Sequence, residues 1–304
     1  MAKTSFMKRI QSSPILFDGA LGSLLAQMGL KAGDCPEKWN RIHPQKVADI
    51  HRAYVQAGAQ VISTNSLGAN RILLDRYGLA DQVLPLNRRA ARIARQTCPP
   101  EVYVAGSVGP TGALCQCTGG FTFDELVAIF REQITGLLEG GVDLICVESM
   151  SDLHEARAAV TAAHSFPQVP VLATMAFVVG PRGFRTTMGV DPQSAVLELA
   201  AAGADAIGCS FGQLTVQQMV KLVSILRNLT DLPLIARPTA GKPRLVRGNT
   251  VYSRTPKQMA EGADLILQAG ATIMGGSWGT TPEHIAAIAE TMGHARHKKR
   301  GTKP

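Results

Sequence analysis

The sequence lacks the features that mark a membrane or secreted protein. None of its apolar runs reaches the roughly 18 uninterrupted residues of a membrane span, and the basic start, Met1 to Gln11, has no apolar signal segment behind it. No linker rich in proline, glycine or serine divides the 304 residues. We therefore expect a single-domain cytoplasmic protein that contacts no membrane.

Two further absences concern nucleic acids and disulfides. The net charge is +8, but residues 294–304 alone contribute five Lys or Arg and no acid, without an aromatic run or a binding motif beside them. We therefore predict a solvated, disordered basic tail over 294–304 and no nucleic-acid partner. Six cysteines in a chain of this size and expected location argue against a disulfide framework and indicate buried thiols, catalysis or metal binding.

Eight short apolar runs alternate with amphipathic helical patterns. The runs are Ile15–Asp18, Val61–Asn65, Val102–Gly106, Leu144–Glu148, Val171–Phe177, Ala206–Cys209, Leu234–Arg237 and Thr272–Met274. Because buried parallel strands are almost continuously apolar, the alternation predicts an α/β protein, a (β/α)8 TIM barrel over residues 15–293 after an N-terminal extension of residues 1–14. A doubly wound open sheet is the alternative, but no G-x-G-x-x-G follows the first strand. The last helix is expected from Pro282 to Met292.

The stretch Ala271–Ile285 combines a short strand, a glycine-rich turn and a helix start. Gly275 and Gly276 permit close backbone approach, and Pro282 suits the first position of a helix. This arrangement is typical of a binding-site turn, and it is also compatible with a plain last turn of an α/β protein.

Polar residues stand where the apolar runs end, which in such a barrel is the active-site face. They are Asp18, Thr64, Asn65, Ser107, Glu148, Cys209, Ser210, Arg237, Thr239, Ser277 and Trp278. Capping of the next helix is an alternative role for Asp18, whereas Glu148 has no such role. Two carboxylates at one mouth predict a ligand that carries an ammonium group.

Seven further motifs occur in the order known from one enzyme family. They are Phe17–Gly22, Trp39–Asn40 with His43–Pro44, Tyr54–Ala59, Thr64–Asn70, Gly106–Gly112, Val142–Leu144 with Glu148 and Glu155–Ala156, and Ala240–Pro243. With Met274–His284, they resemble the homocysteine S-methyltransferase family, which includes the homocysteine domain of cobalamin-dependent methionine synthase and betaine:homocysteine methyltransferase. The resemblance implies a barrel that positions a thiol amino acid, with Asp18 and Glu148 holding its amino group. We assign substrate binding to Asp18, Asn65, Ser107, Glu148 and Trp278.

The sequence departs from that family at its metal site. The resemblance implies three zinc thiolates, of which Cys209 is similar to the first, but the two cysteines after the paired glycines are here Ser277 and Trp278. Zinc would deprotonate a substrate thiol whose free pKa is about 8.5. Cys115 and Cys117, which follow a loop at the same mouth, would rebuild a three-thiolate site with Cys209, and two loop thiols without a role are the alternative. His154 and His284 are weaker candidates, because solvation or capping is more common for histidines in helical patterns.

Three functions follow from these observations. The first is a methyltransferase that moves a methyl group from a small donor, or from methylcobalamin on a separate corrinoid protein, to a thiol acceptor, with Cys209 catalytic. The second acts with a corrinoid protein on a methylated substrate that is not a thiol, and Trp278 then faces a methylammonium group or merely fills the mouth. The third is a silent barrel that binds an amino acid or a partner protein, against which the polar strand ends count.

Overall fold

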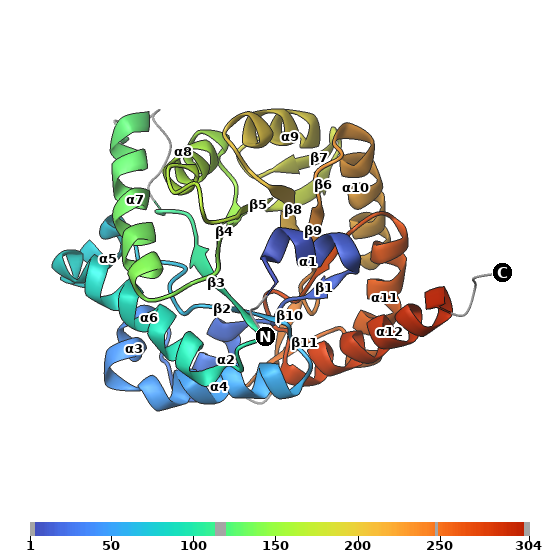
Figure 1. The fold of residues 1–304 in the computed structure, drawn as a ribbon, viewed down its shortest axis with the longest axis horizontal. Coiled ribbons are helices and arrows are strands. Elements are labelled where there is room, and N and C mark those ends of the chain that lie inside the picture. Colours follow the sequence, from blue (N-terminus) through green and yellow to red (C-terminus); the bar gives the residue numbers. More distant parts are fainter. Residues whose placement is uncertain (1–3, 113–119, 247–248, 301–304) are drawn as a thin grey trace.

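The barrel predicted from the sequence is confirmed. The computed structural model describes residues 4–112, 120–246 and 249–300. Its main sheet has eight parallel strands in the order β1-β12-β9-β8-β5-β4-β3-β2, and a parallel bridge between Phe17 and Val61 joins the two ends of that order. Helices surround the strands (Figure 1). The carboxyl ends of all eight strands therefore meet at one mouth.

The boundaries of the barrel elements agree closely with the predicted ones. The barrel strands are β1 (Ile15–Leu16), β2 (Val61–Ser63), β3 (Tyr103–Val108), β4 (Leu144–Met150), β5 (Val171–Met175), β8 (Ala206–Ser210), β9 (Leu234–Arg237) and β12 (Ile273–Met274). The helices are α1 (Phe6–Ser12), α2 (Leu21–Gln27), η1 (Pro36–Lys38), α3 (Trp39–Ile42), α4 (Pro44–Gln56), α5 (Arg71–Asp75), η2 (Ala80–Gln82), α6 (Val83–Thr97), α7 (Phe123–Glu139), α8 (Leu153–His164), α9 (Pro192–Ala201), α10 (Val216–Leu229), α11 (Pro256–Gln268) and α12 (Pro282–Arg300).

Two antiparallel hairpins were not predicted. β6 (Phe177–Gly180) pairs with β7 (Gly183–Thr186), and β10 (Pro243–Val246) pairs with β11 (Asn249–Tyr252). Both lie outside the barrel sheet and follow the ends of barrel strands. Much of their surface is exposed, so they lack the continuous apolar pattern from which the barrel strands were recognised.

Side chains of each strand alternate between two apolar layers. Ile15, Leu144 and Ile235 belong to the cluster inside the barrel, whereas their neighbours along the strands pack in the layer beneath the helices. Phe6 and Ile10 of α1 join the inner cluster. The predicted N-terminal extension thus forms a helix that lies over the barrel axis in Figure 1 and covers its amino-terminal end.

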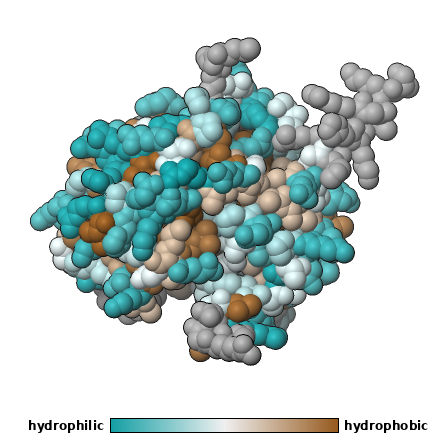
Figure 2. Space-filling view, turned by 90° about the horizontal axis from the view of Figure 1, so that it is seen from below, coloured by the Kyte–Doolittle hydropathy of each residue, from teal (hydrophilic) through white to brown (hydrophobic). Residues whose placement is uncertain are grey.

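The last helix is longer than expected. α12 continues past Met292, its expected end, to Arg300, because Ala, Lys and Arg are good helix formers and no glycine or proline intervenes between Gly293 and Gly301. Disorder of the basic tail over 294–304 stays a prediction. None of the described helices has the length and apolar composition that crossing a bilayer requires. On the face drawn in Figure 2, hydrophilic side chains predominate and hydrophobic ones form small patches.

His51 of α4 gives the fold a testable pH dependence. Its side chain is fully buried, and neither ring nitrogen has a hydrogen-bond partner among the described residues. Burial lowers the pKa of His51 from 6.5 to about 4. Between pH 6.5 and about 4, His51 is therefore protonated in the unfolded chain but neutral in the folded chain. The free energy of unfolding is consequently constant above pH 6.5 with respect to this group and decreases as the pH falls toward 4.

We predict that His51→Leu gains about 2 kcal/mol of stability relative to the wild type between pH 7.5 and pH 5, because about 1.5 units of the pKa difference lie above pH 5. Urea unfolding at the two pH values measures the difference. An equal effect of the substitution at both pH values would contradict the prediction.

Candidate active site

A cavity of about 820 Å³ opens at the carboxyl ends of the strands. It is bounded by the start of α2, by the loop after β2 and by the hairpin β10–β11. Four of the five predicted substrate-binding residues line it: Asn65, Ser107, Glu148 and Trp278. The fifth, Asp18, is fully buried behind the cavity wall.

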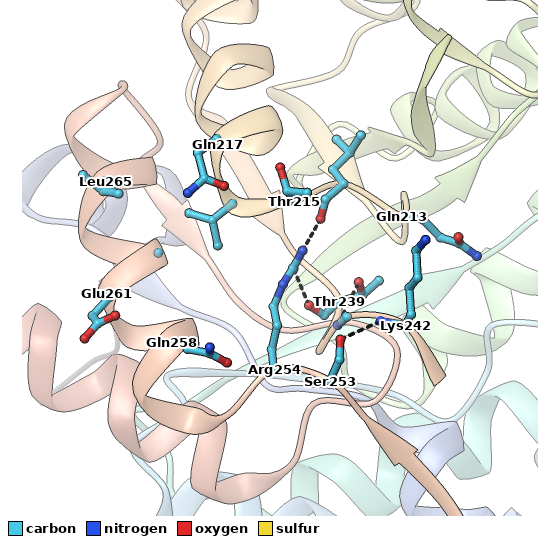
Figure 3. A pocket seen from close by; sticks show the side chains of 14 residues that line it. Gln213, Thr215, Gln217, Thr239, Lys242, Ser253, Arg254, Gln258, Glu261 and Leu265 are labelled. Atoms are coloured by element: carbon cyan, nitrogen blue, oxygen red, sulfur yellow. Dashed lines mark hydrogen bonds between the residues drawn. The ribbon is translucent and has the colours of Figure 1, made fainter. Parts of the chain in front are cut away.

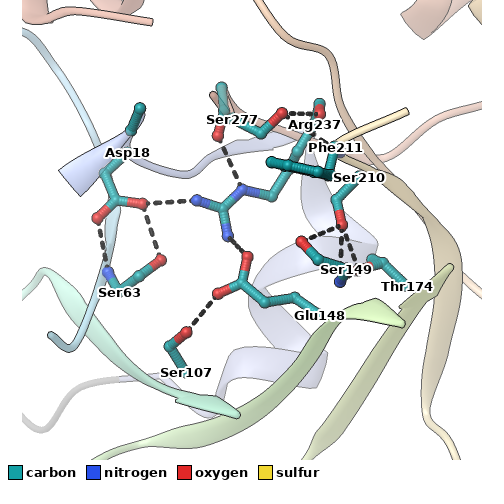
Figure 4. Close-up of polar contacts among 12 residues, drawn as sticks. Asp18, Ser63, Ser107, Glu148, Ser149, Thr174, Ser210, Phe211, Arg237 and Ser277 are labelled. Carbon is teal, nitrogen blue, oxygen red and sulfur yellow. Dashed lines mark hydrogen bonds and ion pairs between the residues drawn. The ribbon is translucent and has the colours of Figure 1, made fainter. Parts of the chain in front are cut away.

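Arg237, at the end of β9, lies between the two predicted carboxylates. Its Nη2 is 3.1 Å from Asp18 Oδ1 and its Nη1 is 2.8 Å from Glu148 Oε2, and its side chain is 3% exposed. Figure 4 shows the guanidinium bridging the two acids. The position in which an ammonium group of the ligand was expected is thus occupied by a side chain of the protein itself.

Both carboxylates have further donors. Ser63 donates to Asp18 through its backbone N–H (2.7 Å) and its hydroxyl (2.8 Å). The hydroxyl of Ser107 donates to Glu148 Oε1 at 2.6 Å. Buried acids need such partners, because an unpaired buried charge is strongly destabilising.

Arg237 is also fixed by the glycine-rich turn that was singled out in the sequence. Its Nε donates to the carbonyl oxygen of Gly276 at 3.1 Å, and its guanidinium lies 5.2 Å from the centre of the Phe17 ring. A Cβ at Gly276 would lie 2.3 Å from Thr280 Oγ1, so only glycine fits this close approach. The turn therefore serves to hold the guanidinium in place.

The charge of this group depends on pH. Burial raises the pKa of Asp18 from 3.8 to about 6, against the lowering effects of Arg237 and of the hydrogen bonds from Ser63. Asp18 therefore loses its proton in the folded state only near pH 6. Below that pH the group of Asp18, Arg237 and Glu148 is less negative by one charge.

Two residues at the rim have strained backbones. Ser149 follows Glu148 with φ +63°, and Phe211 follows Ser210 with φ +67°. The N–H of Ser149 donates to Ser210 Oγ at 3.0 Å, and the N–H of Phe211 donates to Ser277 Oγ at 3.3 Å. A left-handed residue other than glycine costs about 1–3 kcal/mol and is concentrated at functional sites.

Aromatic side chains form the outer wall of the cavity. Phe211 and Trp278 stack with ring centres 5.3 Å apart and planes at 21°, and Tyr252 of β11 meets Trp278 edge-on at 6.1 Å. All three line the cavity. The sequence had suggested Trp278 alone, because Tyr252 comes from the unpredicted hairpin.

Cys209, the predicted catalytic residue and metal ligand, does not face the mouth. On β8 the inward positions are Ala206, Gly208 and Ser210, so Cys209 points into the outer layer, where its sulfur lies 3.1 Å from Met219 Sδ of α10. Burial raises the pKa of this thiol to about 12. It is therefore a poor source of thiolate.

The described residues do not fit a zinc site. Among residues 4–112, 120–246 and 249–300 no group of three or more His, Cys, Asp or Glu side chains could hold a metal ion. The hydroxyl of Ser277 donates to the carbonyl oxygen of Arg237 at 2.8 Å. His284 contacts Thr281 Oγ1 and the carbonyl oxygen of Arg254, in keeping with a capping role. Cys115 and Cys117 lie outside the described residues.

Asn65 and His154 have structural partners. Asn65 Nδ2 donates to the carbonyl oxygen of Pro36 at 2.8 Å and to Asn40 Oδ1 at 3.1 Å, so it ties η1 and α3 to the rim. The ring of His154 meets Phe123 edge-on at 5.4 Å. Neither side chain has a bond to Arg237 or its carboxylates among the described contacts.

A second cavity, of about 480 Å³, lies between the starts of α10 and α11 (Figure 3). Its charged groups are Lys242, Arg254 and Glu261. Arg254 donates to the carbonyl oxygens of Thr239 and Leu214, and its pKa is lowered by burial. Among the described residues that line this cavity there are no paired carboxylates, and of the polar strand-end residues only Thr239, so we place the active site at the mouth.

The bridge made by Arg237 gives a second testable prediction. Arg237→Met should destabilise the fold by about 3–5 kcal/mol at pH 8, because it leaves buried carboxylates without their counter-ion. Without the guanidinium, the pKa of Asp18 rises further above 6, so the deficit grows between pH 6 and 8 as the wild-type acid ionises. Arg254→Met, which removes bonds to carbonyl oxygens only, is the control. Urea unfolding that shows the same deficit for Arg237→Met at pH 5 and pH 8 would refute the ionic role.

Comparisons with known proteins show the family to which the barrel belongs. The family model described as homocysteine S-methyltransferase matches residues 15–292. The methionine synthase of Mycobacterium tuberculosis is 28% identical over 317 residues, covering 98% of this chain and 26% of that protein. The corresponding figures for the methionine synthase of Mycobacterium leprae are 29% over 315 residues, 95% and 25%. The chain thus spans about a quarter of the length of these curated relatives.

Solved structures give the same result. The homocysteine methyltransferase MmuM from Escherichia coli in its oxidized form has a TM-score of 0.75 and 25% identity, covering 91% of this chain and 95% of that chain. Its metallated form has a TM-score of 0.75 and 24% identity, covering 91% and 96%, and supports the fold. With the match of the family model over nearly the whole barrel, these findings show that the chain belongs to the homocysteine S-methyltransferase family.

Proposed function

We propose that this chain transfers a methyl group to a thiol acceptor bound in the mouth cavity. The donor is a small methylated sulfonium or ammonium compound, or a methylated corrinoid carried by a separate protein. The observation that supports this most directly is the Glu148–Arg237 pair, which lines a cavity large enough for a small acceptor and the methyl group of a donor. Membership of the family supports the same reaction.

In the reaction the acceptor sulfur attacks the methyl carbon. A sulfur–carbon bond forms while the bond between the methyl group and the donor breaks, and the bonding electron pair stays with the donor. The thiol proton becomes strongly acidic as sulfur takes up the methyl group. Glu148, the carboxylate of the cavity wall that Arg237 and Ser107 hold in position, is the base that accepts this proton.

Zinc has no part in the proposed reaction. The zinc chemistry implied by the family would need thiolates at the mouth, and the described residues offer Ser277 and Trp278 there, with Cys209 facing α10.

A second candidate is methyl transfer from a methylated amine rather than to a thiol. It is favoured by the aromatic wall, since the faces of Trp278, Phe211 and Tyr252 can attract a methylammonium group. Demethylation of such amines with an added corrinoid protein, without methylation of any thiol, would support this candidate over the first.

The assay incubates the purified chain with small thiols, homocysteine included, and with S-methylmethionine, betaine or methylcobalamin in turn. We expect an S-methyl product with at least one donor. Glu148→Gln should lower kcat/KM at least 100-fold, because a positioned general base contributes about 10²–10⁴-fold. Glu198→Gln, which changes an exposed acid paired with Arg157, is the matched control. A Glu148→Gln variant with the kcat/KM of the wild type would show that Glu148 is not the base.

A metal measurement tests the assignment of Cys209. Because this side chain faces α10, Cys209→Ser should change neither the zinc content per chain nor the methyl transfer rate by more than about twofold, while lowering stability by about 1 kcal/mol through a buried hydroxyl. Metal analysis, rate assays and urea unfolding measure the three quantities. If the variant instead loses one zinc per chain, the hypothesis of a zinc site formed by Cys209, Cys115 and Cys117 would be supported.

A further inference from the structure

We infer that the thiol accepted at the mouth carries no ammonium group, because the guanidinium of Arg237 already occupies the position between Asp18 and Glu148. The inference rests on the proposed function only in naming the ligand as a thiol. It departs from what two converging carboxylates suggested in the sequence, where Arg237 was noted as a strand end without a role.

Asp18 is closed to any ligand. Its side chain is fully buried and does not line the cavity. Oδ2 accepts from the N–H of Ser63, and Oδ1 accepts from the hydroxyl of Ser63 and from Arg237. Asp18 is therefore a positioning residue for the guanidinium and not a contact for a substrate amine.

Of the two acids bound to Arg237, Glu148 is the one that lines the cavity. Both of its carboxylate oxygens accept a hydrogen bond. Oε1 accepts from Ser107, and Oε2 accepts from Arg237. An ammonium group beside Glu148 would lie next to the guanidinium, where the two like charges repel each other. To take the place between the acids, the ammonium would have to displace Arg237 and leave its charge buried without a counter-ion.

Glu37 is the other carboxylate of the cavity wall, and it is also engaged. Its Oε1 accepts from the N–H of Gly68 at 2.7 Å, and its Oε2 lies 3.4 Å from the thiol sulfur of Cys35. Burial raises its pKa, which favours the uncharged acid. Among the described residues of the cavity wall, no carboxylate without partners is thus available to an ammonium group.

The rest of the cavity suits an uncharged, apolar part of a ligand. Phe211 and Trp278 present a stacked aromatic wall, and Leu21 and Leu67 also line the cavity. A thiol with a short hydrocarbon chain, with or without a carboxylate, could bury that chain against these side chains. Such a ligand needs no ammonium group to bind in the cavity.

Two thiols that differ by one amino group test the inference. Homocysteine and 4-mercaptobutanoate have the same chain, thiol and carboxylate, and only homocysteine carries an ammonium group. In calorimetry with the purified full chain, we expect 4-mercaptobutanoate to bind at least tenfold more tightly, which corresponds to about 1.4 kcal/mol. Equal or tighter binding of homocysteine would overturn the inference, whatever acid of the wall held its amine.

Arg237→Met provides the reciprocal experiment. It frees Glu148, the acid of this group that lines the cavity, so the preference should shift toward homocysteine by at least tenfold relative to the wild type. Arg254→Met should leave the wild-type preference in place, since that guanidinium donates to carbonyl oxygens outside the mouth. An unchanged preference in a folded Arg237→Met protein would count against the inference, and if this variant fails to fold, the wild-type comparison decides alone.

The same two thiols separate this inference from the proposed reaction. If 4-mercaptobutanoate binds more tightly but neither thiol is methylated with any donor, the proposed reaction fails and the ligand preference stands. If homocysteine is methylated and binds more tightly, the reaction stands and the inference fails.

Discussion

The buried guanidinium of Arg237 is the constraint on which the mouth of this barrel depends. One positive charge with 3% exposure is stable there only because two carboxylates, one carbonyl oxygen and one ring face surround it. Phe17 and Asp18 follow β1, Glu148 lies in β4 and Gly276 lies in the turn after β12, and these segments are far apart in the chain. The ion pairs therefore hold three strand ends at fixed distances before any ligand enters.

The two strained residues at the rim are hydrogen-bonded to side chains next to the Arg237 network. Ser149 and Phe211 have left-handed backbones directly after Glu148 and Ser210, and their N–H groups are held by the hydroxyls of Ser210 and Ser277. Ser277 in turn donates to the carbonyl oxygen of Arg237. These hydrogen bonds thus stabilise the left-handed backbone at Phe211. In that conformation the ring of Phe211 stacks on Trp278 in the aromatic wall of the cavity.

The sequence predicted the barrel well because its eight strands are buried on both faces. Runs such as Leu144–Val147 are apolar without interruption, and glycine after helices such as α4 marks the repeated units. The hairpins β6–β7 and β10–β11 escaped detection because they bury few side chains and so carry no apolar pattern. Tyr252 was therefore missing from the predicted site.

Side-chain direction is the part of the candidate site that sequence patterns did not specify. Strand ends indicate which residues are near the mouth, but the two-residue alternation decides which of them face it. On β8 the inner cluster begins with Ala206, so Ser210 faces inward and Cys209 outward. Cys209 was assigned from the family resemblance and Ser210 was noted beside it at the strand end, and the structure distinguishes the directions of the two side chains. The pairing of Arg237 could likewise be expected only in part, since a buried arginine requires acids but the sequence does not give the distances to Asp18 and Glu148.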